Sequence, residues 1–405
     1  MRVLHTADWH IGQTLNGWSR ETEHRLFLAR LADVIEDEAI DLMLVAGDVF
    51  DSTNPSGESQ RLLYTALAGF KRRRPGLTII LTGGNHDPAL RLEAPTDLFA
   101  SFDIHVFGTV RRQGAAVDAA AHLVPVPGPD GAVVLHVLAL PFLRASDLTG
   151  LRFSEAEDGL TVTEAARRFH EDIVRAAEPV LGDLPLIAMG HLHCSGGLES
   201  EGAERRLFVG GAEGVPPDIF PARIDYVALG HLHGPQSLGG GRVRYSGSAF
   251  PLSASEIRHR HGVTILTVEG RSIAQRHREI PWPAPVLRLP ASGVGTLADL
   301  ERALQAIPPA TEPALRPLVY VELLAEDAPA VVMARAEALL RAAPVRPAGI
   351  RIHRAETVEA PLRAPVRSLR ETRPEDLFIA AFRKKHGTAP EDRHLAAFRD
   401  VAGEG

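Results

Sequence analysis

The chain contains a single cysteine, almost no lysine and no long hydrophobic run. Only 3 of its 405 residues are lysine, and Cys194 has no second cysteine with which to form an intrachain disulfide. A lone thiol fits a reducing compartment. No stretch reaches the roughly 18 apolar residues that a membrane span needs. The N-terminal segment carries charge where a signal peptide is apolar. We therefore expect a soluble, cytoplasmic protein.

An excess of positive charge is also missing. The chain has 44 Lys and Arg residues against 51 Asp and Glu residues, which gives a formal net charge of −7. A protein that binds nucleic acid by bulk attraction is usually basic, so any such contact here must use local patches or a partner. None of the lysines follows a glycine, as the Gly-Lys pair of a P-loop requires. If nucleotide hydrolysis belongs to this biology, another chain supplies it.

What the chain does have is an ordinary globular composition with many histidines. Hydrophobic residues make up 45% and charged residues 23%, and the length suits two or three domains. This excludes disordered, collagen-like and disulfide-stapled proteins. The 18 histidines outnumber the lysines. Since histidine is the commonest metal ligand, their positions relative to the expected strands decide whether a metal site is present.

The first 270 residues alternate strand-like and helix-like patterns. Short apolar runs predict strands at 2–6, 41–46, 77–82, 133–140, 186–189, 226–229, 242–246 and 263–268. Apolar residues at helical spacing predict helices at 21–39, 58–73 and 163–181. This alternation predicts an α/β fold in which helices cover a sheet.

A proline-rich segment at 281–285 predicts a domain boundary. A smaller α/β segment follows, with helices expected at 296–306 and 330–342 and strands at 318–324 and 349–353. We predict four parts: residues 1–280, a small domain at 281–355, a linker at 356–367 and a helix pair at 368–405.

The helix pair is predicted from an internal repeat. Residues 372–382 and 388–398 match at most positions, and each copy starts with Thr followed three residues later by Glu, as in a capping box. About 30 residues cannot bury a core alone, so the pair must dock on its own chain or on a partner. The preceding linker favours a partner.

Five of the expected strands end in polar residues that suit metal binding. These residues are Asp8 and His10; Asp48 and Asp51; Asn85, His86 and Asp87; His191 and His193; and His231 and His233. Because ligands bind beyond the carboxyl ends of strands in α/β sheets, we expect the five clusters to converge. Glycines precede Asp48, Asn85, His191 and His231, and they allow sharp turns and close approach.

The ligand types indicate which metals are suitable. Carboxylates, an amide and imidazoles without a thiolate cluster favour Mn²⁺, Fe²⁺ or Zn²⁺ over a structural zinc or calcium site. Seven or eight ligands suit two metals bridged by one carboxylate, a site that clamps in-line attack on phosphorus. Each cluster alone is typical of an ordinary loop. Their occurrence in order, each after an apolar strand, favours the metal site.

This motif series resembles the calcineurin-like metallophosphoesterases. Within that superfamily the chain is similar to the SbcD family, the nuclease subunits of bacterial SbcCD exonucleases. The finer similarity lies in residues 4–13, 47–51, 225–233 and 245–248. It covers residues 1–270 and is looser from 281 onward. The resemblance implies a two-sheet β-sandwich flanked by helices, with a small α/β capping domain and a C-terminal helix pair.

The resemblance also implies roles for individual residues. One metal is held by Asp8, His10 and His233, Asp48 bridges, and a second metal is held by Asn85, His191 and His231. His86 lies beside the scissile phosphate as the catalytic residue. Manganese is the family's usual metal, with Mg²⁺, Fe²⁺ and Zn²⁺ as alternatives. From the residues themselves, we expect Asp51 and Asp87 to orient ligands through hydrogen bonds. We expect His193 to be an outer group or a loop residue, and Cys194 to be a buried, inert thiol.

The function implied is that of a DNA nuclease, a double-strand exonuclease and single-strand endonuclease, in DNA repair, recombination and replication. Its partner is an SbcC-type coiled-coil ATPase, and a homodimer through early helices forms within a heterotetramer. The predicted docking residues of the helix pair are Leu377, Phe378, Phe382, Leu395 and Phe398. For DNA, Asn16 and Arg20 are candidate contacts. The basic runs at 71–74 and 111–112 either meet phosphates or are solvated.

Two other functions compete with this one. A stand-alone phosphoesterase acting on a small nucleotide or a phosphoprotein needs the same ligands, but the capping domain and the helix pair count against it. A non-catalytic scaffold is a third interpretation, and it has no need of a full ligand set.

Overall fold

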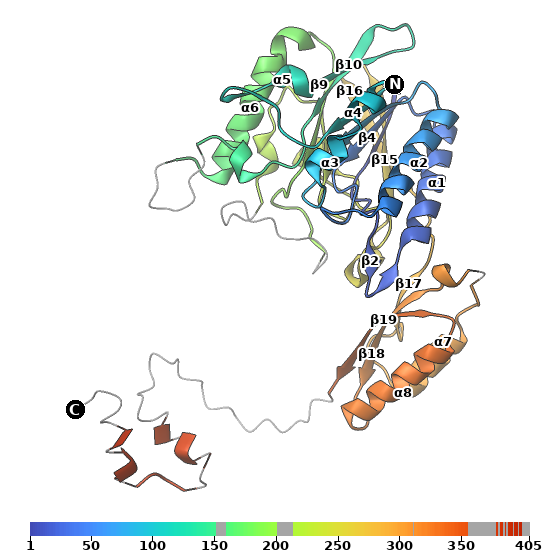
Figure 1. Cartoon of the computed structure of the whole chain (residues 1–405), viewed down its shortest axis with the longest axis vertical. Coiled ribbons are helices and arrows are strands. Elements are labelled where there is room, and N and C mark those ends of the chain that lie inside the picture. The colour runs from blue at the N-terminus through green and yellow to red at the C-terminus, as the bar shows by residue number, and fades with distance from the viewer. Residues whose placement is uncertain are drawn as a thin grey trace. The chain divides into compact units, whose positions relative to one another are not determined.

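Two six-stranded sheets pack face to face in the larger part of the molecule (Figure 1). The structure is a computed structural model that describes residues 1–150, 159–200, 214–310 and 312–354, with parts of 378–398. The first sheet, in spatial order, contains β16 (Ser272–Glu279), β15 (Gly262–Glu269), β1 (Arg2–Thr6), β4 (Leu42–Ala46), β5 (Thr78–Thr82) and β6 (Ile104–Phe107). The second contains β13 (Gln236–Leu238), β14 (Val243–Tyr245), β12 (Tyr226–Gly230), β11 (Leu186–His191), β10 (Val133–Ala139) and β9 (Leu123–Pro127).

The central strands are apolar along their whole length because both of their faces are buried. Every residue of β4, β5 and β12 is buried. Leu44 and Ile80 of the first sheet share a core with Val137 and Ile187 of the second. Neighbouring central strands run parallel, from β1 through β4 and β5 in one sheet and from β10 through β12 in the other. The carboxyl ends of parallel neighbours therefore lie at a common edge.

Helices cover the outer faces of the two sheets. Figure 1 shows α1 (Glu21–Asp37) and α2 (Gly57–Arg73) on one side and α6 (Val162–Leu181) on the other. Each side has its own apolar core, with Phe27 and Leu67 on the first and Ile173 on the second. Thr161 and Glu164 form a capping box at the start of α6. The predicted α/β fold is confirmed, and the strands divide between two sheets.

Shorter elements complete this part of the chain. They are β2 (Thr14–Leu15), β3 (Trp18–Ser19), α3 (Ala89–Glu93), α4 (Thr96–Ala100), β7 (Arg112–Gln113), β8 (Ala116–Val117), α5 (Ala119–His122) and the 3₁₀ turns η1 (Ala145–Asp147), η2 (Pro217–Ile219), η3 (Gly239–Gly241) and η4 (Ala254–Arg258). No helix in the described segments is both long enough and apolar enough to cross a bilayer.

The small domain, residues 286–353, follows the proline-rich segment. Its elements are β17 (Val286–Leu289), α7 (Leu297–Gln305), η5 (Pro313–Leu315), β18 (Leu318–Leu324), α8 (Pro329–Ala342) and β19 (Arg346–His353). The three strands are parallel, and Leu300 and Leu340 from the helices pack on Val319 and Val321. This arrangement is an α/β layer with its own core.

A buried ion triad joins the small domain to α1. The Glu23 carboxylate accepts hydrogen bonds from Arg20 Nε at 2.8 Å and Nη2 at 2.6 Å, and from Arg346 Nη2 of β19 at 2.9 Å. Arg20 also donates to the Pro251 carbonyl oxygen at 2.8 Å and lies over the Phe250 ring. Arg20, a candidate DNA contact, has its guanidinium fully buried in these interactions.

The described residues from Arg354 onward belong to a unit separate from residues 1–353. The rings of Phe378 and Phe398 stack with centroids 4.6 Å apart, and Phe382 lies 5.8 Å from Phe378. Leu395 is half-buried. The predicted linker at 356–367 and the docking residue Leu377 lie outside the described residues. The described phenylalanines therefore pack against each other within the pair.

Replacing Glu23 with alanine should lower the free energy of unfolding by about 3–5 kcal/mol, because two guanidinium groups then remain buried without a counter-charge. Glu21→Ala, on the exposed face of the same helix turn, should cost less than about 1 kcal/mol. Chemical denaturation monitored by circular dichroism measures both changes. Equal losses in the two variants would contradict the structural role of the triad.

Candidate metal centre

The carboxyl ends of five strands, three from the first sheet and two from the second, bring the predicted clusters together. Asp8 and His10 follow β1, Asp48 follows β4 and Asn85 follows β5. His191 ends β11, and His231 and His233 follow β12. The site therefore lies where the two sheets meet.

The backbone at several of these residues is held in an uncommon conformation. Of the seven non-glycine residues with positive φ in the described part of the chain, four are Asp8, His10, Asp48 and His231. Such conformations cost free energy, and they persist where the surrounding structure imposes them, often at functional sites. Gly84 allows the backbones to approach closely, because a Cβ atom there would lie 2.1 Å from Asp48 Oδ1.

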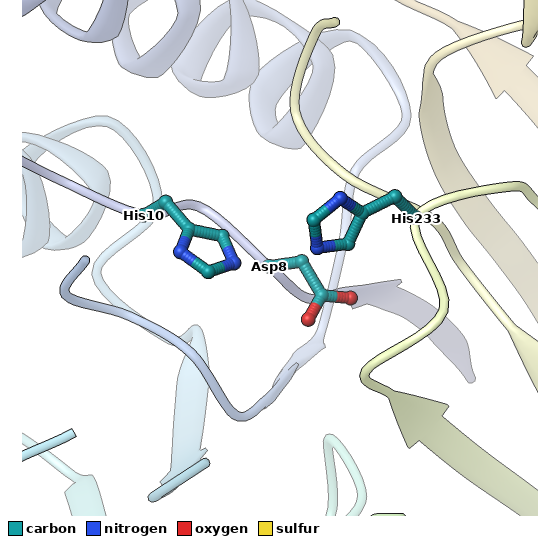
Figure 2. A group of neighbouring side chains, drawn as sticks. All are labelled: Asp8, His10 and His233. Atoms are coloured by element: carbon teal, nitrogen blue, oxygen red, sulfur yellow. The ribbon is translucent and has the colours of Figure 1, made fainter. Parts of the chain in front are cut away.

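Figure 2 shows Asp8, His10 and His233 turned toward one another. Their ligand atoms lie within 4.8 Å of each other, and all three residues are buried. Asp8, Asp48 and His191 form a second group with the same spacing. Asp48 Oδ2 lies 3.5 Å from His10 Nε2 and 3.4 Å from His191 Nε2. Asp48 thus lies between His10 of the first group and His191 of the second.

The residues present fit divalent cations. His10 Nε2 is buried and has no hydrogen-bond partner. The Nδ1 atoms of His10, His191 and His233 lie 3.1 Å from Asp51 Oδ1, 2.9 Å from the Ala46 carbonyl oxygen and 3.0 Å from Glu256 Oε1. Outer acceptors of this kind fix the tautomer of metal-binding histidines and leave Nε2 as the ligand atom. Carboxylates and imidazoles suit Mn²⁺, Fe²⁺ and Zn²⁺.

Asn85 and His231 lie beside the second group. Asn85 Oδ1 is 3.0 Å from His191 Nε2. The His231 ring is 5.4 Å from the His191 ring, and the backbone N–H of His231 donates to the Asp8 carboxylate at 2.9 Å. A bond between residues of different sheets thus fixes Asp8 against the strand that carries His231.

His86 lies at the edge of the cluster and is half-buried. Its backbone N–H donates to Asp48 Oδ1 at 2.9 Å, and its ring is 4.9 Å from the His10 ring. His10, Asp48 and His86 also have ligand atoms within 4.8 Å of one another. The distances therefore allow His86 to act as a ligand, and its predicted role beside the phosphate comes from the resemblance alone.

The remaining predicted residues have distinct partners. Asp87 accepts hydrogen bonds from the backbone N–H groups of Val49, Phe50 and Gly84, and so ties together the loops after β4 and β5. His193 Nε2 is 3.4 Å from Glu199 Oε1. Cys194 is buried, and burial raises the pKa of its thiol to about 12, which fits the expected inert thiol.

The candidate DNA contacts take part in other interactions. Asn16, at an exposed turn, donates to the Tyr320 hydroxyl of the small domain at 3.0 Å. Lys71 donates to the Leu77 carbonyl oxygen, and Arg73 and Arg74 pair with carboxylates near the end of α2. Three residues of the basic run at 71–74 are therefore paired with groups of the same chain in this structure.

Sequence reasoning missed Glu256, a fully buried acid on η4. Its carboxylate is hydrogen-bonded to His233, and it also accepts hydrogen bonds from the Leu252 N–H at 3.0 Å and from the Ser248 hydroxyl at 3.2 Å. The signal available was the spacing Ser253-x-x-Glu256, which resembles a helix start. That spacing does not reveal that the carboxylate is buried.

Comparisons with known proteins agree with this geometry. The family model of calcineurin-like phosphoesterases matches residues 1–235, and the model described as a type 5 capsule protein repressor C-terminal domain matches residues 283–386. The SbcD subunit of the nuclease SbcCD from Rhodobacter capsulatus is 54% identical over 385 residues, 94% of each chain. The proteins of the same name from Escherichia coli K12 and Bacillus subtilis are 32% identical, covering 75% of this chain and 74% of that protein, and 37% identical, covering 66% of each.

The chain belongs to the calcineurin-like phosphoesterases and, within them, to the SbcD family of SbcCD nuclease subunits. This confirms the resemblance and the fold class predicted from the motifs.

The affinity of the site for Mn²⁺ should rise as the pH increases from 6 to 9. Burial raises the pKa of Asp8 to about 6. Burial opposes the charged form of His191, but the Asp48 carboxylate raises the pKa of His191 to about 9. Both groups must be deprotonated to bind metal, so binding near pH 7 should release about one proton. Calorimetry in two buffers with different ionisation enthalpies measures this release, and a pH-independent affinity would contradict it.

Proposed function

We propose that this chain is a Mn²⁺-dependent DNA nuclease that acts as a double-strand exonuclease and single-strand endonuclease in the processing of DNA ends. The observation that carries the proposal is the buried convergence of Asp8, His10, Asp48, His191 and His233. The names of the relatives, nuclease subunits, support a nucleic acid as the substrate.

In this proposal the predicted ligands divide into two sets around Asp48. Asp8, His10 and His233 hold one ion, and Asn85, His191 and His231 hold the other. Two bound divalent ions would stabilise charge on the attacking and leaving oxygens of an in-line displacement at phosphorus. The protein supplies rigid placement, because Asp87 and the Asp8–His231 bond fix the loops that carry the ligands.

His86 acts at the leaving oxygen. Its Nδ1 lies 2.9 Å from the Asp51 carbonyl oxygen, which can only accept, so Nδ1 keeps its proton. Proton exchange is therefore confined to Nε2. A protonated imidazole is suited to donate its proton to a departing alkoxide.

The proposed partner is an SbcC-type coiled-coil ATPase, which fits the absence of a P-loop from this chain. The helix pair of residues 368–405 would dock on it. Among the described residues of the pair, Phe378, Phe382 and Phe398 form one apolar cluster. Amphipathic helices commonly bind a partner by laying their apolar face into a hydrophobic groove.

A homodimer is also proposed, through α2 and α4. A cavity of about 820 Å³ lies there, lined by Tyr64, Leu67, Phe99 and others. Leu98 and Phe102 at its rim are 63% and 54% exposed. A concentration of exposed large apolar side chains marks an interaction surface. The early position of α2 agrees with the dimer that the resemblance implies.

Asp48→Ala and His86→Ala should differ in metal content. Asp48→Ala removes the carboxylate between the two ion positions, so bound Mn²⁺ and cleavage are both lost. His86→Ala should keep the metals and lower turnover by about 10²–10⁴-fold. Equilibrium dialysis measures the metal, and release from labelled linear duplex DNA and from a generic phosphodiester measures turnover. His105→Ala, on β6, is the matched control.

Equal metal loss in both variants would refute the separate roles. Cleavage of the generic ester without cleavage of DNA would indicate a small-molecule phosphoesterase. Absence of both activities in the wild-type protein would indicate a scaffold.

Deleting residues 368–405 should abolish co-purification with the ATPase and leave cleavage of the generic phosphodiester unchanged, because the ligand set lies wholly within residues 8–233. A full-length Phe378→Glu/Phe398→Glu variant should give the same result. Arg393→Ala, an exposed change in the same pair, is the control. Co-purification of the truncated chain with the ATPase would refute this docking site.

A further inference from the structure

We infer that Glu256 is a positioning residue of the metal centre, which holds the His233 ring with Nε2 directed at the first ion position. The inference rests on the proposed function and concerns the same site. Glu256 belongs to η4, more than twenty residues beyond the last predicted ligand in the sequence, and none of the predicted metal-binding clusters contains it.

The carboxylate of Glu256 sets the tautomer of His233. Glu256 Oε1 lies 3.0 Å from His233 Nδ1, and both side chains are almost completely buried. An ionised carboxylate can only accept, so the proton of the neutral imidazole stays on Nδ1. The lone pair is then on Nε2. Figure 2 shows this nitrogen turned toward Asp8.

The carboxylate is itself fixed by the loop that surrounds it. Oε2 accepts from the Leu252 N–H at 3.0 Å and from the Ser248 hydroxyl at 3.2 Å, and the Ser253 hydroxyl donates to Oε1 at 3.2 Å. His261 Nε2 lies 3.1 Å from the Glu256 carbonyl oxygen. Donors thus face both carboxylate oxygens, and the orientation of Glu256 is fixed.

His10 has the same arrangement, since its Nδ1 faces Asp51 Oδ1 at 3.1 Å. Both imidazoles of the Asp8 group are therefore backed by a carboxylate. A carboxylate behind a ligating histidine also raises the basicity of the ligand nitrogen. If Glu256 had a purely structural role, a carboxylate would not be required at this position, because a neutral acceptor satisfies the Leu252 N–H equally well.

The glutamine variant exposes this difference, because an amide has one acceptor end and one donor end. If its oxygen stays at the Leu252 N–H, its NH₂ group faces His233 Nδ1 and moves the imidazole proton to Nε2, where it blocks metal binding. If its oxygen faces His233, the NH₂ group opposes the Leu252 N–H. Either orientation weakens the site.

Glu256→Gln should therefore lower the affinity for Mn²⁺ by about 10–100-fold, measured by isothermal titration calorimetry on the full chain. Glu93→Gln is the matched control: this carboxylate accepts from the Gly108 and Thr109 N–H groups and contacts no predicted ligand. Its affinity for Mn²⁺ should equal that of the wild-type protein.

A double-mutant cycle separates positioning from general stability. In a His233→Ala background, Glu256→Gln should cause no further loss of Mn²⁺ affinity, because the residue on which Glu256 acts is gone. A full additive loss, or an unchanged affinity in the single variant, would overturn the inference. If the wild-type chain binds no Mn²⁺, the proposed function fails, and the inference fails with it.

A melting curve recorded in the presence of a chelator shows whether Glu256→Gln folds. If it does not fold, a milder variant is used for the test. Ser253→Ala removes one donor to Glu256 Oε1 and leaves the carboxylate in place. A few-fold loss of Mn²⁺ affinity then supports the positioning role, and an unchanged affinity overturns it.

Discussion

The crowding of buried carboxylates where the two sheets meet is the constraint on which the rest of the structure depends. Burial raises the pKa values of Asp8 and Asp87 to about 6, and the charge of Asp48 contributes to both shifts. Burial acts in the same direction on Asp48, but the neighbouring His191 and His10 hold the pKa of Asp48 well below its usual range. So much negative charge requires protons or cations nearby. The loops at the strand ends, with their strained backbones, hold the imidazoles facing inward. These imidazoles and the carboxylates together provide positions where protons or cations can bind.

Much of the fold was predictable from the sequence because both faces of its central strands are buried. The apolar runs predicted β1 with its observed bounds and β4 and β12 within one residue. The strand β16 was missed, since it is a polar edge strand with exposed arginines and carries no apolar pattern. The division of strands between two sheets came from the resemblance, because alternation of strands and helices is the same for one sheet or two.

Site residues were predictable from the sequence where a polar motif directly follows an apolar strand. They were not predictable where the role of a side chain depends on whether it is buried. Every predicted metal ligand lies after or at the end of a strand, so motif and position agreed. Arg20 lies in the loop after Asp8 and His10, a position that suggests a DNA contact, but its guanidinium is buried inside the protein against Glu23. Glu256 was missed for the converse reason, since an acid in a short 3₁₀ turn is normally solvated. The excess of histidine was also ambiguous. His24 and His170 are buried away from the ligand set, and burial lowers the pKa of each to about 4.

The ion triad has a structural consequence. Arg346 of the small domain pairs with Glu23, Glu23 pairs with Arg20, and Arg20 donates to the Pro251 carbonyl oxygen. The next residue along the chain, Leu252, donates its N–H to the carboxylate that backs His233. The small domain and the loop that supports His233 are thus connected, through the first turn of α1, by a continuous series of buried polar contacts.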